Sequence, residues 1–386
     1  MSTDNFIFRM ATTVMFGKGI VAQLPTKVKE FKKDKVLIVT DKGVRQAGLL
    51  APIEKSLADA GLHVAVFDDV EPDPGLDTIH QGAAFFKEQK SDFLVALGGG
   101  SPMDTAKGIR ILADHGGHIR DYAGMNKVPA RSSIPLVTIP TTSGTGSEVT
   151  IFAVLSDWEH NVKITISSPY LAADLALVDP LLTLSAPPRI TAATGMDALA
   201  HAIETYVSNL AQPPADTLAL KAIALIGANL RAAVANGSKP EPRTEMSLGS
   251  LLAGMAFNNA FLGITHSLGA ALSGHAHVSH GMAIASLLPY VMEYNAMADL
   301  GKYGDIALAL GEKVEGLSLR DRAFAAAEAV RNLTEDINLP SRLREFGVKE
   351  EDLAGMAKSA IGHGMVKMNP RHPNETELFD ILKKAL

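Results

Sequence analysis

Short, continuous apolar runs alternate with helix-like segments through the first half of the chain. The apolar runs predict buried strands at residues 35–41, 63–67, 93–97 and 134–139. Helical spacing of apolar residues predicts helices up to about residue 60, then over 78–90 and 105–113. Strands that are apolar along their whole length, separated by helices, are typical of a parallel sheet covered on both faces.

The pattern changes near residue 186. From about Pro187 onward, Ala, Leu, Met, Glu and Lys recur at helical spacing, and strand signals nearly vanish. Pro187 and Pro188 suit the start of a helix, because a helix tolerates proline in its first turn. We therefore predict an α/β domain over residues 1–185 and an all-helical domain over residues 186–386. The length of 386 residues favours two domains over one.

Composition narrows the possible functions. The chain has no cysteine, which excludes a thiolate nucleophile, an iron–sulfur cluster and a disulfide framework. A net charge of −6 argues against nucleic acid as a partner. The N-terminal segment is too polar for a signal peptide, and no uninterrupted apolar stretch is long enough to span a bilayer. We expect a cytoplasmic protein that does not bind membranes.

Three glycines, Gly98, Gly99 and Gly100, directly follow the third predicted strand. Ser101 is a plausible N-cap, and Pro102 suits the first helical position. The unpaired amides and the positive end of the helix dipole would then face the loop, an arrangement that suits a pyrophosphate. The alternative is a tight strand-to-helix turn without a ligand.

An earlier segment, Gly17-Lys-Gly19-Ile-Val-Ala22, matches the dinucleotide-binding pattern G-x-G-x-x-G/A. We favour a plain turn here, because the preceding strand is short and poor. Asp41 ends the 35–41 strand and is well placed to meet a ribose hydroxyl. A carboxylate at that point would repel a 2′-phosphate, which favours NAD over NADP.

A second polar loop, PTTSGTGS over residues 140–147, follows the fourth predicted strand. It supplies hydroxyls and backbone amides, although a polar turn without a ligand would have the same composition. Two such loops at the ends of neighbouring strands make a nucleotide site more plausible than either loop alone.

The helical half contains a concentration of histidines and one well-spaced carboxylate. Asp197 and His201 are four residues apart and share one helix face, so they could hold one ion, although such a pair alone is usually a surface pair. Four further histidines fall within fifteen residues: His266, His275, His277 and His280. One carboxylate with two or three imidazoles suits Fe²⁺ or Zn²⁺ with a position left for substrate.

Together these motifs resemble one family, the iron-containing (group III) alcohol dehydrogenases, and most closely its lactaldehyde (1,2-propanediol) reductase-like members. The resemblance covers essentially the whole chain and rests on motifs that occur in the family's order. These are FGKG, VTDKG, GGGSPMDTAK, IPTTSGTGSEVT, TAATGMDALAHAIE, LAGMAFNNA and Asn369-Pro370-Arg371.

The resemblance implies a fold, a reaction and a set of site residues. The fold is an N-terminal Rossmann-like parallel-sheet domain followed by an all-α domain, as also in dehydroquinate synthase. The reaction is a reversible hydride transfer between NAD(H) and a small primary or secondary alcohol or diol, with Fe²⁺ or Zn²⁺, in a homodimer or larger homo-oligomer. The implied metal ligands are Asp197, His201, His266 and His280. The implied cofactor residues are Asp41, Asp73, Gly98, Gly99, Gly100, Ser101, Thr141, Thr142, Thr145 and Lys163.

The chain also departs from the family pattern. Members usually carry a histidine four residues after the position of His266, and here that residue is Ala270. The proton route is therefore open, with His275 and Asp104 as candidate catalytic residues. Asp73 replaces the usual asparagine of a P-N-P turn. Phe152 stands where diol-active members can have a polar residue, which favours a bulkier or less polar substrate.

Two other functions remain possible from sequence. A lyase like dehydroquinate synthase would need Lys and Arg near the metal, but residues 197–204 and 266–280 contain neither. A non-catalytic nucleotide-binding protein is disfavoured by the retention of all four ligand positions.

Overall fold

The computed structural model describes residues 5–160 and 162–386, so the first four residues of the polar N-terminal segment lie outside the described part. The chain forms two compact units. The α/β unit comprises residues 10–142 and 146–185, and the helical unit comprises residues 5–9, 143–145 and 186–386.

The α/β unit contains a six-stranded, entirely parallel sheet. Its strand order is β1-β9-β6-β4-β2-β3. The strands are β1 (Thr13–Phe16), β2 (Lys35–Val39), β3 (His63–Phe67), β4 (Phe93–Gly98), β6 (Leu136–Pro140) and β9 (Leu175–Val178). The predicted fold class is confirmed, and the sheet also includes β1 and β9 beside the four predicted strands.

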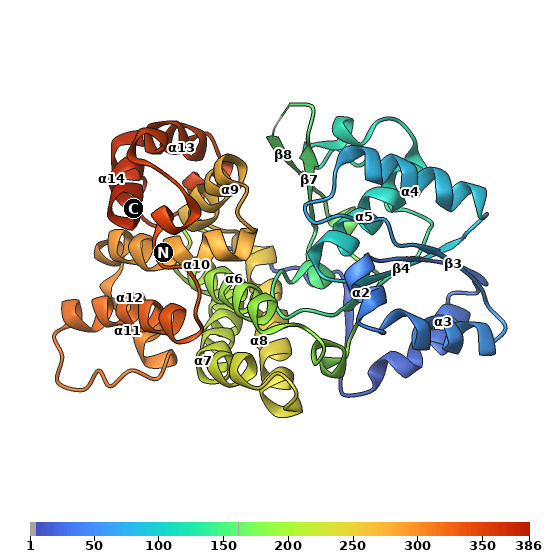
Figure 1. The fold of residues 1–386 in the computed structure, drawn as a ribbon, viewed down its shortest axis with the longest axis horizontal. Coiled ribbons are helices and arrows are strands. Elements are labelled where there is room, and N and C mark those ends of the chain that lie inside the picture. Colours follow the sequence, from blue (N-terminus) through green and yellow to red (C-terminus); the bar gives the residue numbers. More distant parts are fainter. Residues whose placement is uncertain (1–4, 161) are drawn as a thin grey trace. The chain divides into compact units, whose positions relative to one another are not determined.

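Helices cover both faces of this sheet. Alternate residues of each strand point to opposite sides, and both sides carry apolar side chains that the helices bury. Leu37, Leu94 and their neighbours pack under α4 (Leu76–Glu88) and α5 (Gly100–His115). Ile38 and Val95 pack on the other face, against α1 (Leu24–Glu30) and α3 (Leu50–Asp59). Figure 1 shows α4 and α5 above the strands and α3 below them.

A small second sheet, absent from the sequence-based prediction, joins β5 (Gly124–Met125), β8 (Val162–Ser167) and β7 (Phe152–Asp157) in that order. The strands β7 and β8 are antiparallel partners. Val154, at 40% exposure, and Val162, at 51%, lie on β7 and β8. The buried side chains of the hairpin join the core under α5 through Ala153, Leu155 and Ile166.

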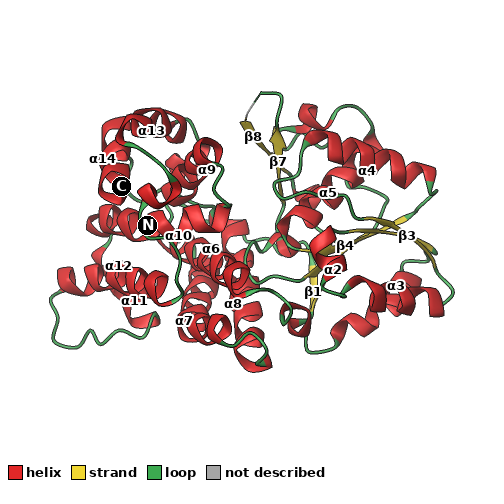
Figure 2. Cartoon of the chain, in the orientation of Figure 1, coloured by secondary structure: helices red, strands yellow, loops and turns green. Residues whose placement is uncertain are grey.

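The first α-helix of the helical unit begins where the two prolines predicted a helix start, at Pro188. Figure 2 shows that its regular structure is helical. Its α-helices are α6 (Pro188–Val207), α7 (Pro213–Ala235), α8 (Pro240–Ala260), α9 (Ile264–Ala276), α10 (His280–Asn295), α11 (Leu300–Ala309), α12 (Leu319–Asp336), α13 (Leu353–Ile361) and α14 (Glu375–Ala385). One core joins α6, α7, α8, α10, α11 and α12, and a second joins α9, α10, α13 and α14.

One helix of the helical unit is long and apolar. By length and composition, α7 is apolar enough to cross a bilayer, and so is the bent pair α8–α9 taken as one span. The prediction that no uninterrupted apolar stretch is long enough still holds, because Lys221 and Arg231 interrupt α7. Within the unit, Ala219, Ile223 and Ile226 of α7 are fully buried in the core with α6. This burial is typical of the central helix of a helical domain.

Candidate active site

The glycine loop after β4 takes a backbone shape that requires glycine. Gly98 has φ +149°, and a Cβ added there would lie 2.6 Å from Cγ of Pro102 and 3.4 Å from Oδ2 of Asp41. The helix α5 begins at Gly100, with the extended Gly99 as its N-cap. The prediction of Ser101 as N-cap is therefore wrong, because the chain is already helical there. The open first-turn amides of α5 remain a suitable site for a phosphate group.

The loop lies where the order of the strands reverses. From β2 the chain moves outward to β3 and then returns to β4 on the other side of β2. Ligands of open α/β sheets bind in the crevice at such a reversal. The hydroxyl of Thr40, just after β2, donates to the carbonyl of Leu97 at 2.8 Å. Asp41 follows, and its Oδ1 accepts from the amide of Val44 at 2.8 Å as the N-cap of α2 (Lys42–Gln46).

Other predicted cofactor residues also lie in the α/β unit. The amide of Thr141 donates to the Gly98 carbonyl at 3.0 Å, and Oγ1 of Thr142 lies 3.2 Å from the position of a Cβ on Gly99. Asp73 and Lys163, ninety residues apart, form an ion pair with Nζ 2.7 Å from Oδ1. Asp73 has φ +53°, a conformation that asparagine and aspartate tolerate better than most residues.

Thr145 belongs to a different part of the structure. The segment 143–145 packs within the helical unit, where Oγ of Ser143 lies 3.1 Å from Oγ of Ser247. A Cβ on Gly144 would lie 2.6 Å from Cβ of Thr194 in α6, so this position also needs glycine.

Sequence reasoning missed a buried charged cluster beneath the second loop. Lys107 of α5 is fully buried, and its Nζ donates to Ser147, to Thr150 and to the carbonyl of Phe152. Burial lowers the pKa of Lys107 to about 8 and raises that of Glu148 to about 7. The sequence signal for this cluster was that Lys107 lies among mostly apolar residues of its helix.

Asp104, a candidate catalytic residue, belongs to the same cluster. Its Oδ1 accepts from Oγ of Ser147 at 2.6 Å, and its Oδ2 accepts from the amide of Val154 at 2.9 Å. Burial raises the pKa of Asp104, against the opposing effect of Lys107. Both oxygens thus hold the loop and β7 to α5, and a catalytic role for Asp104 stays a prediction.

The amides of the Gly17–Gly19 segment are already used. Asp179 accepts from the amide of Gly19 at 3.0 Å and from the amide of Val21 at 3.3 Å. A carboxylate of the protein thus occupies the place where a phosphate would have to bind, which agrees with the interpretation of this segment as a plain turn.

The four predicted metal ligands come together in the helical unit. Asp197 and His201 lie on α6, His266 lies on α9, and His280 is the first residue of α10. Oδ1 of Asp197 lies 3.6, 3.4 and 3.5 Å from the Nε2 atoms of His201, His266 and His280, respectively. Asp197, His201 and His266 are buried, whereas the side chain of His280 is 35% exposed.

The donor atoms of this group fit a cation. Oδ1 of Asp197 and Nε2 of His266 are buried and have no hydrogen-bond partner among the described residues. Each buried polar atom left unpaired costs about 1–3 kcal/mol, so such atoms are rare. The first three residues each place a ligand atom within 4.8 Å of the others, as a shared metal ion requires.

Burial and charge act on these groups in opposite directions. Burial raises the pKa of Asp197, but His201, His280 and His266 outweigh it and hold that pKa well below its usual range. Burial lowers the pKa of His201 to about 4 despite the nearby Asp197. Burial also acts to lower the pKa of His266, but Glu204 and Asp197 together raise it to about 9.

His275 lies apart from these four residues. It follows His266 by nine positions on α9, which corresponds to roughly 13 Å along a helix axis. Its side chain is 44% exposed, and its Nε2 lies 3.2 Å from Oδ1 of Asp352. A direct catalytic role for His275 has no support in this geometry and stays a prediction.

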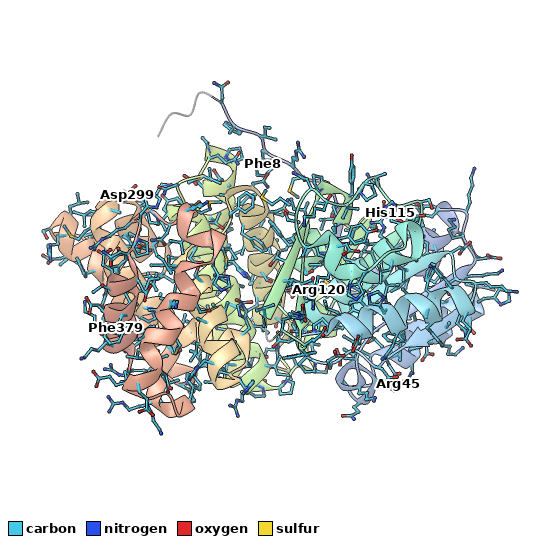
Figure 3. All side chains as sticks on the ribbon, turned by 90° about the horizontal axis from the view of Figure 1, so that it is seen from above. Phe8, Arg45, His115, Arg120, Asp299 and Phe379 are labelled. Atoms are coloured by element: carbon cyan, nitrogen blue, oxygen red, sulfur yellow. The ribbon has the colours of Figure 1, made fainter. Side chains whose placement is uncertain are left out.

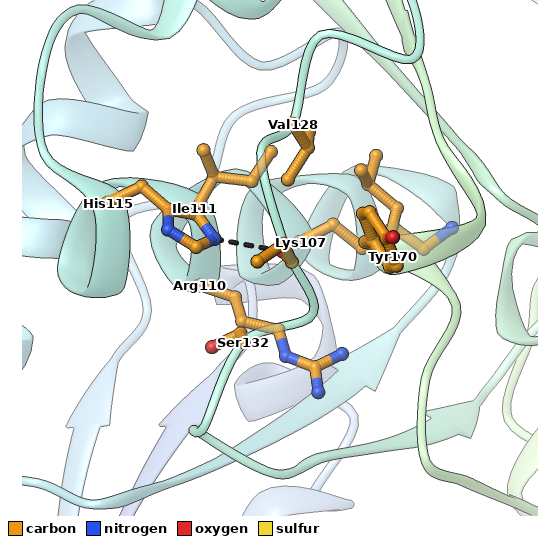
Figure 4. A pocket seen from close by; sticks show the side chains of 9 residues that line it. Lys107, Arg110, Ile111, His115, Val128, Ser132 and Tyr170 are labelled. Carbon is orange, nitrogen blue, oxygen red and sulfur yellow. Dashed lines mark hydrogen bonds between the residues drawn. The ribbon is translucent and has the colours of Figure 1, made fainter.

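Two other places have features of a ligand site. Asp157, Glu159 and His160 form a second acidic and histidine group, but the guanidinium of Arg120 (Figure 3) contacts all three. Beside α5 lies a pocket of about 10 Å³, room for roughly one water molecule (Figure 4). Nε2 of His115 and the Ala130 carbonyl, 3.1 Å apart, lie at this pocket. Neither place suits a substrate.

Comparisons with known proteins identify the family. The chain matches the model of the iron-containing alcohol dehydrogenases over residues 11–180 and that of the C-terminal domain of the Fe-containing alcohol dehydrogenase family over residues 191–386. It is 42% identical to 1,3-propanediol dehydrogenase of Klebsiella pneumoniae over the full length of both. It is 40% identical to lactaldehyde reductase of Escherichia coli (strain K12), covering 97% of each.

A solved structure shows the same fold. The crystal structure of a 1,3-propanediol oxidoreductase superposes with a TM-score of 0.96 at 42% identity, covering 99% of this chain and 100% of that one. The two family models together span nearly the whole sequence. The chain therefore belongs to the iron-containing alcohol dehydrogenase family and is an oxidoreductase.

Proposed function

We propose that this protein is a metal-dependent, NAD(H)-linked alcohol dehydrogenase that interconverts a small primary or secondary alcohol or diol with its aldehyde or ketone. The observation that carries the proposal is one buried carboxylate oxygen, Oδ1 of Asp197, within 3.6 Å of three imidazole Nε2 atoms. The names of the relatives, which act on 1,3-propanediol and lactaldehyde, favour a short, oxygen-rich substrate.

The donor set suits a divalent cation, held by Asp197, His201, His266 and His280. The family name favours Fe²⁺. Zn²⁺ binds such nitrogen and oxygen sites more tightly, so supply also decides which ion is loaded. When bound, the cation would act as a Lewis acid that polarises the substrate's oxygen, and the nicotinamide would exchange a hydride with the substrate's carbon.

The α/β unit supplies the cofactor site. In our proposal, the pyrophosphate binds at the loop Gly98–Gly100 and Ser101, where the first amides of α5 donate to it. Asp41 accepts a hydrogen bond from a ribose hydroxyl. The further proposed cofactor contacts in this unit are Asp73, Thr141, Thr142 and Lys163, and the family resemblance adds Thr145 of the helical unit. The negative charge of Asp41 makes NADH the preferred cofactor, because a 2′-phosphate there would be repelled.

Three further properties belong to this proposal. A methyl group at Ala270 can accept no proton, so no side chain at this position takes part in the proton route. The protein is proposed to work in the cytoplasm as a homodimer or larger homo-oligomer. We expect its partners to be small alcohols and aldehydes rather than nucleic acids or membranes.

NADH oxidation with a panel of short aldehydes tests the proposal. Protein stripped of metal should lose turnover and regain it when Fe²⁺ or Zn²⁺ is added back. An Asp197→Ala variant, which removes the shared carboxylate, should not recover. Full turnover after verified removal of metal would refute the metal-dependent mechanism.

A further inference from the structure

Glu204 is a buried carboxylate that the proposed mechanism does not use. It lies on α6, seven residues after Asp197 and three after His201, and therefore on the same helix face as both. Its exposure is 3%. A charged group is rarely buried to this degree unless it is paired and hydrogen-bonded, so its partners indicate its role.

Three donors converge on the Glu204 carboxylate. Oε2 accepts from the amide of Gly263 at 3.0 Å and lies 2.6 Å from Nδ1 of His266. Oε1 accepts from the amide of Thr265 at 2.6 Å. The donors all belong to the start of α9, where the first amides of the helix have no partner within it.

Asn369, from the Asn369-Pro370-Arg371 motif, completes the support of this helix end. Its Oδ1 accepts from the amide of Ile264 at 3.3 Å. Its side-chain amide also exchanges two hydrogen bonds with Asn295 of α10, at 2.9 and 2.7 Å. A Cβ on Gly263 would lie 2.8 Å from Oδ1 of Asn369 and 3.1 Å from Oε1 of Glu204. Glycine at 263 therefore lets both side chains reach the backbone.

We propose that Glu204, with Asn369, is the positioning residue that fixes the tautomer and ring orientation of His266 for metal binding. A proton held on Nδ1 by Glu204 leaves the lone pair of Nε2 for the cation, on the side of the ring that faces Asp197. Carboxylates that hold the outer nitrogen of a ligand histidine commonly act in this way. The inference rests on the proposed metal-dependent function.

His201 makes an informative comparison within the same group. Its Nδ1 is buried and has no hydrogen-bond partner in the part of the chain that the structure describes. His201 stacks on His266, with ring centroids 4.7 Å apart and planes 16° from parallel. The ring that Glu204 fixes therefore also supports its neighbour, so a loosened His266 would disturb two of the four donors.

The test measures metal binding directly. Zn²⁺ affinity, determined by competition with a chromogenic chelator, should fall about 10- to 100-fold in Glu204→Gln. Glutamine presents one acceptor oxygen and one NH₂ group to three donors, so at least one donor loses its partner. Glu204→Asp keeps the charge but is shorter by one methylene group, and it should recover part of the affinity.

A matched control separates positioning from general destabilisation. Asp305→Asn alters another carboxylate of the helical unit, whose Oδ2 accepts from the hydroxyl of Tyr206 at 2.8 Å. This variant should lose stability without losing Zn²⁺ affinity. If the wild type binds no Zn²⁺, the proposed function fails. If the wild type binds one ion per chain and Glu204→Gln binds it equally well, only the present inference is overturned.

A second measurement covers the case in which Glu204→Gln does not fold. In Zn²⁺-loaded wild-type protein with ¹⁵N-labelled histidine, the signal of His266 is identified by its loss in His266→Gln. A proton on Nδ1 with the metal on Nε2 supports the inference. Metal on Nδ1 would overturn it.

Discussion

At the scale of single residues, two glycines, each from a glycine-containing loop, differ in whether the structure leaves room for a side chain. Gly98 has φ +149°, and an added Cβ would collide with Pro102. Gly17 has open space around the position of its Cβ, and its φ is not positive. The dinucleotide pattern at Gly17 is the closer match to a known motif, and its Gly19 has φ +77°, but a Cβ has open space at both of its glycines, whereas one at Gly98 would collide with a neighbour.

Alanine substitutions should separate the two loops. Gly98→Ala is expected to cost about 2–3 kcal/mol in the free energy of unfolding, through backbone strain and the contact with Pro102. It should also weaken NADH binding. Gly17→Ala should change stability by less than about 0.5 kcal/mol and leave NADH affinity unchanged. Urea denaturation and NADH fluorescence titration measure both effects, and equal losses in the two variants would contradict the assignment of the cofactor loop.

Asp41 offers a test of cofactor choice that leaves its helix cap in place. Serine at this position can still accept the hydrogen bond from the amide of Val44, but it carries no charge. We expect Asp41→Ser to shift the ratio of kcat/KM for NADPH over NADH upward by roughly 10- to 100-fold, as removal of one nearby like charge allows. Steady-state kinetics with both cofactors measures the ratio. An unchanged ratio would show that Asp41 does not face the 2′ position.

At the scale of helices and strands, the sequence predicted elements well where periodicity was strong. The strand at 63–67 coincides with β3, and the helix at 78–90 differs from α4 by two residues at each end. The hairpin of β7 and β8 was missed because its residues mix apolar, charged and hydroxyl side chains on a half-exposed surface. Helix periodicity predicted that Asp197 and His201 would pair. It could not predict that α9 and α10 would bring His266 and His280 to them, because that depends on how separate helices pack.

The loop after β6 is held to α5 by buried charges, which makes its stability depend on pH. Burial raises the pKa of Glu148 to about 7 from its ordinary value near 4.5. At a pH between these two pKa values, Glu148 keeps a proton in the folded state that it releases in the unfolded chain. The contribution of Glu148 to the free energy of unfolding therefore falls as the pH rises. Glu148→Gln cannot ionise. It should therefore gain about 1–3 kcal/mol relative to wild type as the pH rises from about 4.5 to about 7.

Urea denaturation of both proteins at several pH values measures this difference. The control is Glu351→Gln, which changes a carboxylate whose side chain is 75% exposed and should run parallel to wild type. Parallel curves for Glu148→Gln as well would mean that Glu148 is ionised in the folded protein throughout this range.

At the scale of the whole molecule, the proposed chemistry is divided between two units with separate cores. The strands and helices of the α/β unit enclose their own buried clusters, and so do the helices of the other unit. Most of the proposed cofactor residues belong to the first unit, and all four proposed metal ligands belong to the second. A ligand stabilises the folded form of the unit that binds it, by an amount set by its concentration and dissociation constant.

Two spectroscopic probes can follow the units separately. Trp158, the single tryptophan of the sequence, lies just after β7 in the α/β unit, with its ring beside Gly75. Circular dichroism at 222 nm reports mainly on helices, most of which lie in the other unit.

Zn²⁺ at about a thousand times its dissociation constant should stabilise the helical unit by about 4 kcal/mol and raise its melting temperature by roughly 10 °C. NAD⁺ should instead raise the midpoint seen by tryptophan fluorescence. In Asp197→Ala the effect of Zn²⁺ should vanish while that of NAD⁺ persists, and equal shifts of both probes with either ligand would contradict the proposed division of binding sites.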